Sequence, residues 1–177
     1  MKLKFQMIDE DTKELLPERT YEFIRSFDKD KQIRVAEIDP AYADGDSLSR
    51  EYELPYEMEL NCLVIEGRRG EDISHAAVLV PYGKRVSMNT KVRGPLNAKE
   101  VKFADLEYVM QKTGMEYGSI TPIGLPDDWK ILIDASVFDQ EEVIVGGGLV
   151  RSKLILPSVL FREMTNCEVI EGLAKDR

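Results

Sequence analysis

Residues 61–80 read NCLVIEGRRGEDISHAAVLV, and this stretch decides the fold. Two runs rich in β-branched and aliphatic residues, 61–65 and 76–80, lie on either side of the charged segment 67–70, which has a glycine at each end. Two apolar runs separated by a glycine-containing turn are typical of antiparallel strands. We therefore predict a β-hairpin in the middle of the chain.

Further short elements are predicted on both sides of this hairpin. We expect strands at 2–7, 33–38, 101–103, 131–134, 143–145, 154–156 and 169–170, and helices from Pro17, from Asp46 to Tyr52, from Asp105 to Gly114 and after Pro157. Pro suits a first helical turn, Asp is a good helix cap, and Gly often ends a helix. The irregular order of strands and helices indicates an α+β fold and not a doubly wound one.

The length of 177 residues fits one domain, 1–177, whose first 18 residues we interpret as an N-terminal extension. Hydrophobic residues make up 43% of the chain and charged residues 32%, as in ordinary globular proteins. No apolar run approaches the length of a membrane helix, and the charged start MKLK does not resemble a signal peptide. We therefore expect a cytoplasmic protein with no membrane partner.

The few cysteine and histidine residues exclude several classes of site. Cys62 and Cys167 each lie in an apolar segment, which favours buried thiols over a disulfide or a nucleophile. His75 is the only histidine, so neither a zinc site nor a histidine-based catalytic triad has enough ligands or groups. We expect no metal and no cofactor.

The net charge of −9 is unevenly distributed along the chain. Residues 61–110 carry 8 basic and 6 acidic side chains, whereas residues 1–60 carry 9 and 16. The basic residues of the middle segment form either a modest phosphate-facing patch or an ordinary solvated surface. The overall charge disfavours tight, sequence-indifferent binding of nucleic acid.

Residues 113–126, TGMEYGSITPIGLP, form a loop rich in glycine and proline. Glycine permits backbone conformations that other residues avoid, and Pro122 and Pro126 fix their φ angles. A rigid loop of this kind can present backbone amides to carbonyl or phosphate oxygens. A binding site and a long surface connection are both compatible with this composition.

Taken together, 61–64, 113–124, 133–134 and 145–148 closely resemble the YbaK/prolyl-tRNA editing-domain family, and the similarity runs from about Tyr21 to Ala174. The resemblance implies a single α+β domain with a mixed, largely antiparallel, barrel-like sheet flanked by helices. Members of this family hydrolyse the ester of mischarged tRNA, either in trans or as domains attached to prolyl-tRNA synthetase.

The resemblance also implies site residues. The loop from Gly118 to Pro122 matches the Gly-x-x-x-Pro loop of the family, which holds the ester carbonyl and the terminal adenosine against backbone amides. The glycine turn of the family, which borders the pocket and leaves room for ribose or the aminoacyl group, falls at 146–148. The residues assigned in this way are Gly118, Ser119, Ile120, Thr121, Pro122, Gly146, Gly147 and Gly148.

Asn61 is the one departure from the family pattern, because it stands where the family has a lysine. An asparagine can donate a hydrogen bond but supplies no charge. Chemistry in the family is thought to be substrate-assisted, with a tRNA ribose hydroxyl helping to activate water, so activity without the lysine is possible. Asn61 could equally be a strand residue that satisfies a neighbouring backbone group.

The leading hypothesis is a deacylase that acts in trans on the acceptor end of mischarged aminoacyl-tRNA, with an aminoacyl-tRNA synthetase as a further partner. Asn61, Gly118, Ser119 and Ile120 are its candidate catalytic residues. The alternative is a non-catalytic module of the same fold that recognises an adenosine-like or aminoacyl-like ligand. A third possibility, a protein-interaction domain that uses the acidic segment 1–60, leaves the glycine loop unexplained.

Overall fold

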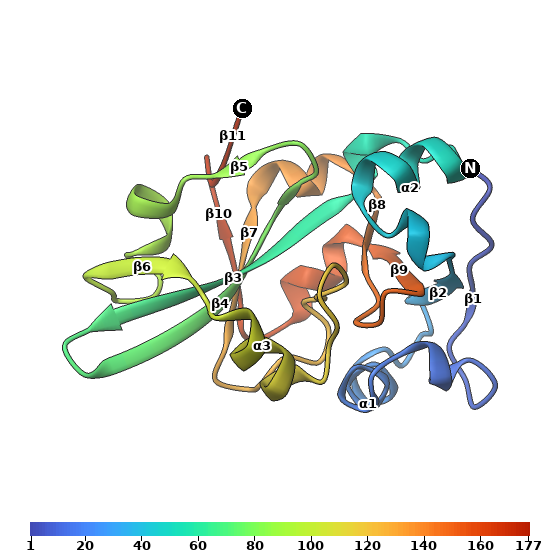
Figure 1. The fold of residues 1–177 in the computed structure, drawn as a ribbon, viewed down its shortest axis with the longest axis horizontal. Coiled ribbons are helices and arrows are strands. Elements are labelled where there is room, and N and C mark those ends of the chain that lie inside the picture. Colours follow the sequence, from blue (N-terminus) through green and yellow to red (C-terminus); the bar gives the residue numbers. More distant parts are fainter.

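The computed structural model describes all residues from 1 to 177 (Figure 1). The helices are α1 (Glu18–Phe27), α2 (Gly45–Tyr52) and α3 (Leu106–Thr113). The strands are β1 (Gln6–Met7), β2 (Arg34–Glu37), β3 (Leu60–Arg69), β4 (Asp72–Pro81), β5 (Arg85–Val86), β6 (Glu100–Phe103), β7 (Lys130–Asp134), β8 (Glu142–Gly146), β9 (Ser152–Pro157), β10 (Cys167–Ile170) and β11 (Ala174–Lys175). None of the helices has the length and apolar character needed to cross a membrane.

The strands form one five-stranded, one four-stranded and one two-stranded sheet. In the larger sheet, of order β10-β7-β4-β3-β6, β7 is parallel to β10 and β4, whereas the β3–β4 and β3–β6 pairs are antiparallel. The smaller sheets, β1-β2-β9-β8 and β11-β5, are antiparallel throughout. The predicted α+β fold with a mixed, largely antiparallel sheet is therefore confirmed, although the strands do not close into a barrel.

The predicted antiparallel hairpin of β3 and β4 is confirmed, and its pairing runs without interruption from Leu60↔Pro81 to Arg69↔Asp72. The predicted turn at 67–70 is wrong, because residues 67–69 are paired in β3 and the turn is Gly70 and Glu71. Residues 76–80 of β4 are apolar without alternation, as expected for a strand segment that is buried on both faces. Ala77 and Leu79 belong to the main core, and Val78 and Val80 belong to a second cluster on the opposite face. The hairpin thus separates the two core clusters that pack on its opposite faces.

The helix ends follow their capping residues, with one correction. Pro17 precedes α1, and the Asp105 side chain accepts a hydrogen bond from the Tyr108 amide at the start of α3, which ends at Gly114 with φ 69°. The prediction that Asp46 caps α2 is wrong. The Asp44 side chain accepts the capping hydrogen bond from the Ser47 amide, and α2 begins at the residue after Asp44, Gly45.

Two other predicted elements are shorter or tighter than expected. The strand expected at 2–7 is only the two-residue β1, which lies at an open edge of its sheet. The helix expected after Pro157 is a 3₁₀ helix, Ser158–Glu163, that runs directly from the end of β9. Both differences arise where tertiary pairing and not local propensity sets the backbone.

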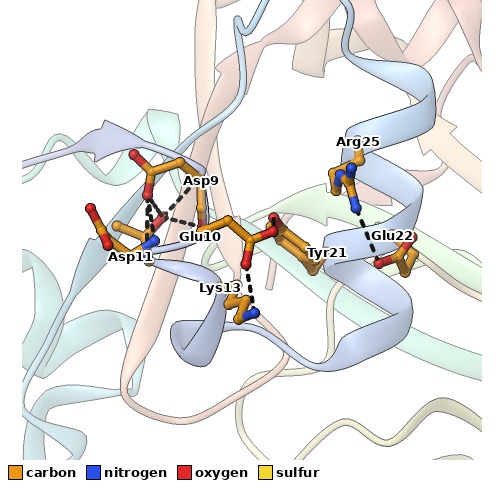
Figure 2. Close-up of polar contacts among 8 residues, drawn as sticks. Asp9, Glu10, Asp11, Lys13, Tyr21, Glu22 and Arg25 are labelled. Atoms are coloured by element: carbon orange, nitrogen blue, oxygen red, sulfur yellow. Dashed lines mark hydrogen bonds and ion pairs between the residues drawn. The ribbon is translucent and has the colours of Figure 1, made fainter.

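The N-terminal segment is fastened to α1 by polar contacts (Figure 2). The Glu10 carboxylate accepts hydrogen bonds from Lys13 Nζ at 2.6 Å and from the Tyr21 hydroxyl at 3.3 Å. Leu15 and Leu16, which follow directly, are buried in the main core. The first 18 residues therefore pack on the domain, and their description as an extension of it stays a prediction.

Candidate functional site

A cavity of about 490 Å³ lies where β3, β8 and β9 meet the loop between α3 and β7. Twelve of its 19 lining residues are hydrophobic, which is typical of pockets that bury most of a small ligand. The lining residues are Ala43, Asp44, Gly45, Glu59, Leu60, Asn61, Cys62, Leu63, Val64, Tyr82, Phe103, Ala104, Leu106, Val109, Tyr117, Gly118, Ile120, Gly146 and Lys153. Seven separate segments of the sequence thus line one cavity.

Gly146, at the end of β8, is the point where these segments meet. A parallel bridge pairs Glu59, which directly precedes β3, with Ile144 of β8, and Asn61 and Gly146 both line the cavity. On the other side of β8, Gly146 pairs with Lys153 of β9. A Cβ on Gly146 would lie only 2.7 Å from the Ser119 carbonyl oxygen, so the loop backbone packs directly on this glycine.

The loop over Gly146 is held by its own hydrogen bonds. The Glu116 amide donates to the Gly148 carbonyl at 2.7 Å, and the Gly148 amide donates to the Ser119 carbonyl at 2.8 Å. By contrast, the amides of Gly118 and Ile120 donate to no acceptor in the protein, and both residues line the cavity. Two backbone donors in a fixed loop are therefore available to a ligand oxygen.

Gly118 has φ 83°, a conformation that strains any residue with a Cβ. No atom lies within 4 Å of the position that a Cβ on Gly118 would occupy. The glycine is thus required by the turn that presents the loop amides and not by crowding inside the protein.

Asn61 lies on β3 and lines the cavity, half-buried. Its side-chain amide makes no hydrogen bond within the protein: neither the backbone nor any side chain pairs with it. An unbonded amide on a cavity wall can donate to and accept from a ligand. This geometry does not fit a residue that satisfies neighbouring backbone groups.

No side chain at the site is arranged as a nucleophile. The Ser119 hydroxyl is buried and donates to the Leu149 carbonyl at 2.8 Å. Burial raises the pKa of the Cys62 thiol to about 12, so the thiol stays protonated at neutral pH. His75 lies outside the cavity, stacked at 5.0 Å against both Tyr108 and Trp129. A bound water is the remaining candidate to attack an ester here.

The cavity also has a charged wall that sequence reasoning missed. Lys153 is 8% exposed, and its Nζ donates to the Ala43 carbonyl at 3.0 Å. Glu59 is buried, accepts a hydrogen bond from the Ser49 hydroxyl, and has its pKa raised by burial. In the sequence, Lys153 is merely one charge before the apolar run 154–156, so only the pairing with Gly146 reveals its place at the site.

The rim of the cavity is apolar and open to solvent. Tyr117 is 71% exposed, Phe103 is 61% exposed, and Leu106 lies beside them, and all three line the cavity. Exposed aromatic rings next to a pocket suit stacking with a planar ligand such as a nucleobase.

The structure brings some of the residues assigned from the sequence into the cavity wall and leaves others behind it. Asn61, Gly118, Ile120 and Gly146 line the cavity, whereas Ser119, Thr121, Pro122, Gly147 and Gly148 do not. Thr121 and Pro122 belong to the same loop but are buried.

The expectation that all three glycines of 146–148 leave room for a ligand needs correction. A Cβ on Gly147 would lie 2.0 Å from Ser152 Oγ, and one on Gly148 would lie 2.6 Å from Pro17. These two positions are glycine because the protein itself packs against them. Only Gly146 combines close approach of the loop with a place on the cavity wall.

Comparisons with known proteins agree with this fold. The family model described as the aminoacyl-tRNA editing domain matches residues 40–163. The solved structure of hypothetical protein APE2540 is similar with a TM-score of 0.76 at 19% identity, over 89% of this chain and 100% of that one. A protein proposed to be a trans-editing enzyme for prolyl-tRNA synthetase gives 0.72 at 17% identity, over 92% of this chain and 99% of that one.

A longer protein proposed to act in signal transduction, from Marinobacter aquaeolei VT8, contains a similar unit. Its TM-score is 0.55 at 14% identity, over 87% of this chain but 30% of that one. At these identities the structural likenesses show the fold alone. No curated protein matches the chain.

Proposed function

The chain belongs to the aminoacyl-tRNA editing-domain family, and we propose that it is a deacylase that acts in trans on mischarged aminoacyl-tRNA. The observation that carries the proposal is the cavity at Gly146, where two free loop amides and the unbonded Asn61 side chain share one wall. Donors fixed in place around an enclosed space are what hydrolysis of an ester requires.

In the proposed reaction, the ester carbonyl of the aminoacyl group lies against the Gly118 and Ile120 amides. Water adds to the carbonyl carbon, and the loop amides stabilise the negative charge on the carbonyl oxygen. The bond to the ribose oxygen then breaks, that oxygen takes up a proton, and the free amino acid and uncharged tRNA leave. Ser119 and Cys62 are unsuited to attack, which supports a water activated by a ribose hydroxyl of the substrate.

We propose that the terminal adenine stacks on the exposed rim at Tyr117 and Phe103, with the aminoacyl group directed into the cavity. Arg68 of β3 and Lys102 of β6 lie 3.5 and 3.7 Å from the Glu66 carboxylate, with side chains 48% and 68% exposed. We propose that they also contact acceptor-stem phosphates. An aminoacyl-tRNA synthetase is a further proposed partner, which would supply the mischarged substrate.

A second candidate is a binding module that holds an aminoacyl-adenosine end without hydrolysing it. Asn61 favours this reading, because an amide binds a ligand oxygen but lacks the charge of the family lysine. The same cavity, loop and rim would serve such a module.

A deacylation screen distinguishes these candidates. The purified protein is incubated with a panel of tRNAs that carry mismatched small amino acids, and release of amino acid is compared with uncatalysed hydrolysis. Binding of an uncleavable 3′-aminoacylamino-3′-deoxyadenosine is measured in parallel by calorimetry. Release from at least one tRNA supports the deacylase, binding without release supports the module, and neither release nor binding contradicts both.

A further inference from the structure

Lys153 is buried in a way that its own hydrogen bonding does not explain. Lysine is rarely buried without a charged partner, because removing an ammonium group from water is costly. Lys153 forms no ion pair, and its side-chain hydrogen bond to the Ala43 carbonyl uses one of its three N–H donors. The remaining donors belong to a side chain that lines the cavity.

The strand pairing places Lys153 beside Gly146, on the cavity wall that both share with Asn61. Lys153 of β9 pairs with Gly146 of β8, and all three residues line the cavity. Residues opposite each other on paired strands project to the same face of the sheet, with Cα atoms about 5 Å apart. A Cβ on Gly146 would point at the Ser119 carbonyl, so the Lys153 side chain leaves β9 on the face over which the loop lies.

We propose that Lys153 supplies the ammonium group of this site, which the chain lacks at position 61, and that it binds the negative charge developing on the ester carbonyl oxygen. This inference rests on the proposed function. It moves the positive charge from β3 to β9 while keeping it on the wall of the same cavity.

Two carboxyl groups face Lys153 from the elements packed against it. Glu59 precedes β3, and Asp44 caps α2. Burial lowers the pKa of Lys153 below its usual value of 10.5, and these two acids partly oppose that effect. As pH rises through this lowered pKa the ammonium form is lost, so turnover that depends on it should fall at alkaline pH.

The test compares deacylation by the wild type with Lys153→Met, Lys153→Arg and the double variant Asn61→Lys/Lys153→Met. Lys175→Met, at an exposed lysine of β11, is the matched control. We expect Lys153→Met to lower kcat about 100-fold, as loss of an oxyanion donor does, and the double variant to recover at least 10-fold of it. Lys153→Arg should retain activity and move the alkaline fall of kcat to higher pH, because the guanidinium group does not titrate in this range.

A folded Lys153→Met variant with kcat within threefold of wild type would overturn the inference while leaving the proposed function intact. If Lys153→Met does not fold, an alkaline fall that is unchanged in Lys153→Arg overturns it equally. If the wild type releases no amino acid but binds the uncleavable analogue, the deacylase proposal fails. Lys153 is then judged by binding: a 10-fold weaker Kd in Lys153→Arg or Lys153→Met supports its contact with the ligand, and an unchanged Kd contradicts it.

Discussion

Replacing Gly146 by alanine should disable the site more than it destabilises the fold. The added Cβ would lie 2.7 Å from the Ser119 carbonyl oxygen and 2.8 Å from its carbon, whereas ordinary contacts begin at 3.4 Å. The loop must therefore retreat by about 0.7 Å, the difference between the shorter distance and an ordinary contact. Displacement of this size carries the Gly118 and Ile120 amides away from the ester oxygen.

The two effects of Gly146→Ala have different magnitudes. Overpacking by one methyl group costs about 1–3 kcal/mol, and about 2–4 °C of Tm is lost per kcal/mol in a domain of this size. A misplacement near 1 Å of groups that orient a substrate can cost about 100-fold in rate. We expect Tm to fall by about 2–12 °C, by thermal unfolding, and kcat to fall by about 100-fold at a temperature where the variant is folded.

Gly147→Ala is the control for this experiment. Its Cβ would lie 2.0 Å from Ser152 Oγ, so it is also overpacked, but Gly147 is not part of the cavity wall. Its Tm should fall while kcat stays within about threefold of wild type, since no group of the site is displaced. Equal loss of kcat in both variants, or wild-type kcat in folded Gly146→Ala, would refute the role assigned to the Gly146 contact.

Other consequences of the site can be measured separately. Asn61→Ala removes no hydrogen bond within the protein, so Tm should change little while kcat/KM falls. The fall should be about 5-fold if Asn61 makes a neutral hydrogen bond of about 1 kcal/mol, or about 150-fold if it is an oxyanion donor of about 3 kcal/mol. An unchanged kcat/KM would show that Asn61 contacts no substrate. Because the pKa of the Cys62 thiol is raised to about 12, iodoacetamide at pH 8 should leave Cys62 unmodified in peptide mass analysis. Rapid labelling of Cys62 in the native protein would contradict the raised pKa. The double variant Arg68→Glu/Lys102→Glu should bind tRNA more weakly and with a smaller dependence on salt, but should bind the small adenosine analogue as the wild type does. Equal weakening of both ligands would contradict contacts of these residues with the acceptor-stem phosphates.

Local sequence patterns predicted most of the fold, because they reflect local physical rules. The hairpin of β3 and β4 follows from two apolar runs around a glycine-containing turn, and α3 follows from Asp105 and Gly114 at its ends. The cap of α2 was misplaced by two residues because Asp44 and Asp46 are equally good caps in isolation. The choice between them depends on where the preceding turn delivers the chain.

The site was only partly predictable for a different reason. The blocks around Asn61, Gly118 and Gly146 could be found from the order of motifs, but Lys153 enters the site only through its pairing with Gly146. Pairing between β8 and β9 is a tertiary property that a lysine next to an apolar run does not reveal. The same holds for Gly147, whose neighbour Ser152 is set by the turn between these strands.

The departure at Asn61 and the burial of Lys153 are explained by one electrostatic argument. Lysines at both 61 and 153 would place two ammonium groups on the wall of one cavity. Like charges there repel each other, by about 3 kcal/mol for a separation of about 5 Å and an effective dielectric constant near 20. A site with one cation at either position avoids this repulsion, and a neutral amide at the other position still provides a donor. Under the role proposed for Lys153, an asparagine at 61 is the neutral donor that such a cavity accommodates.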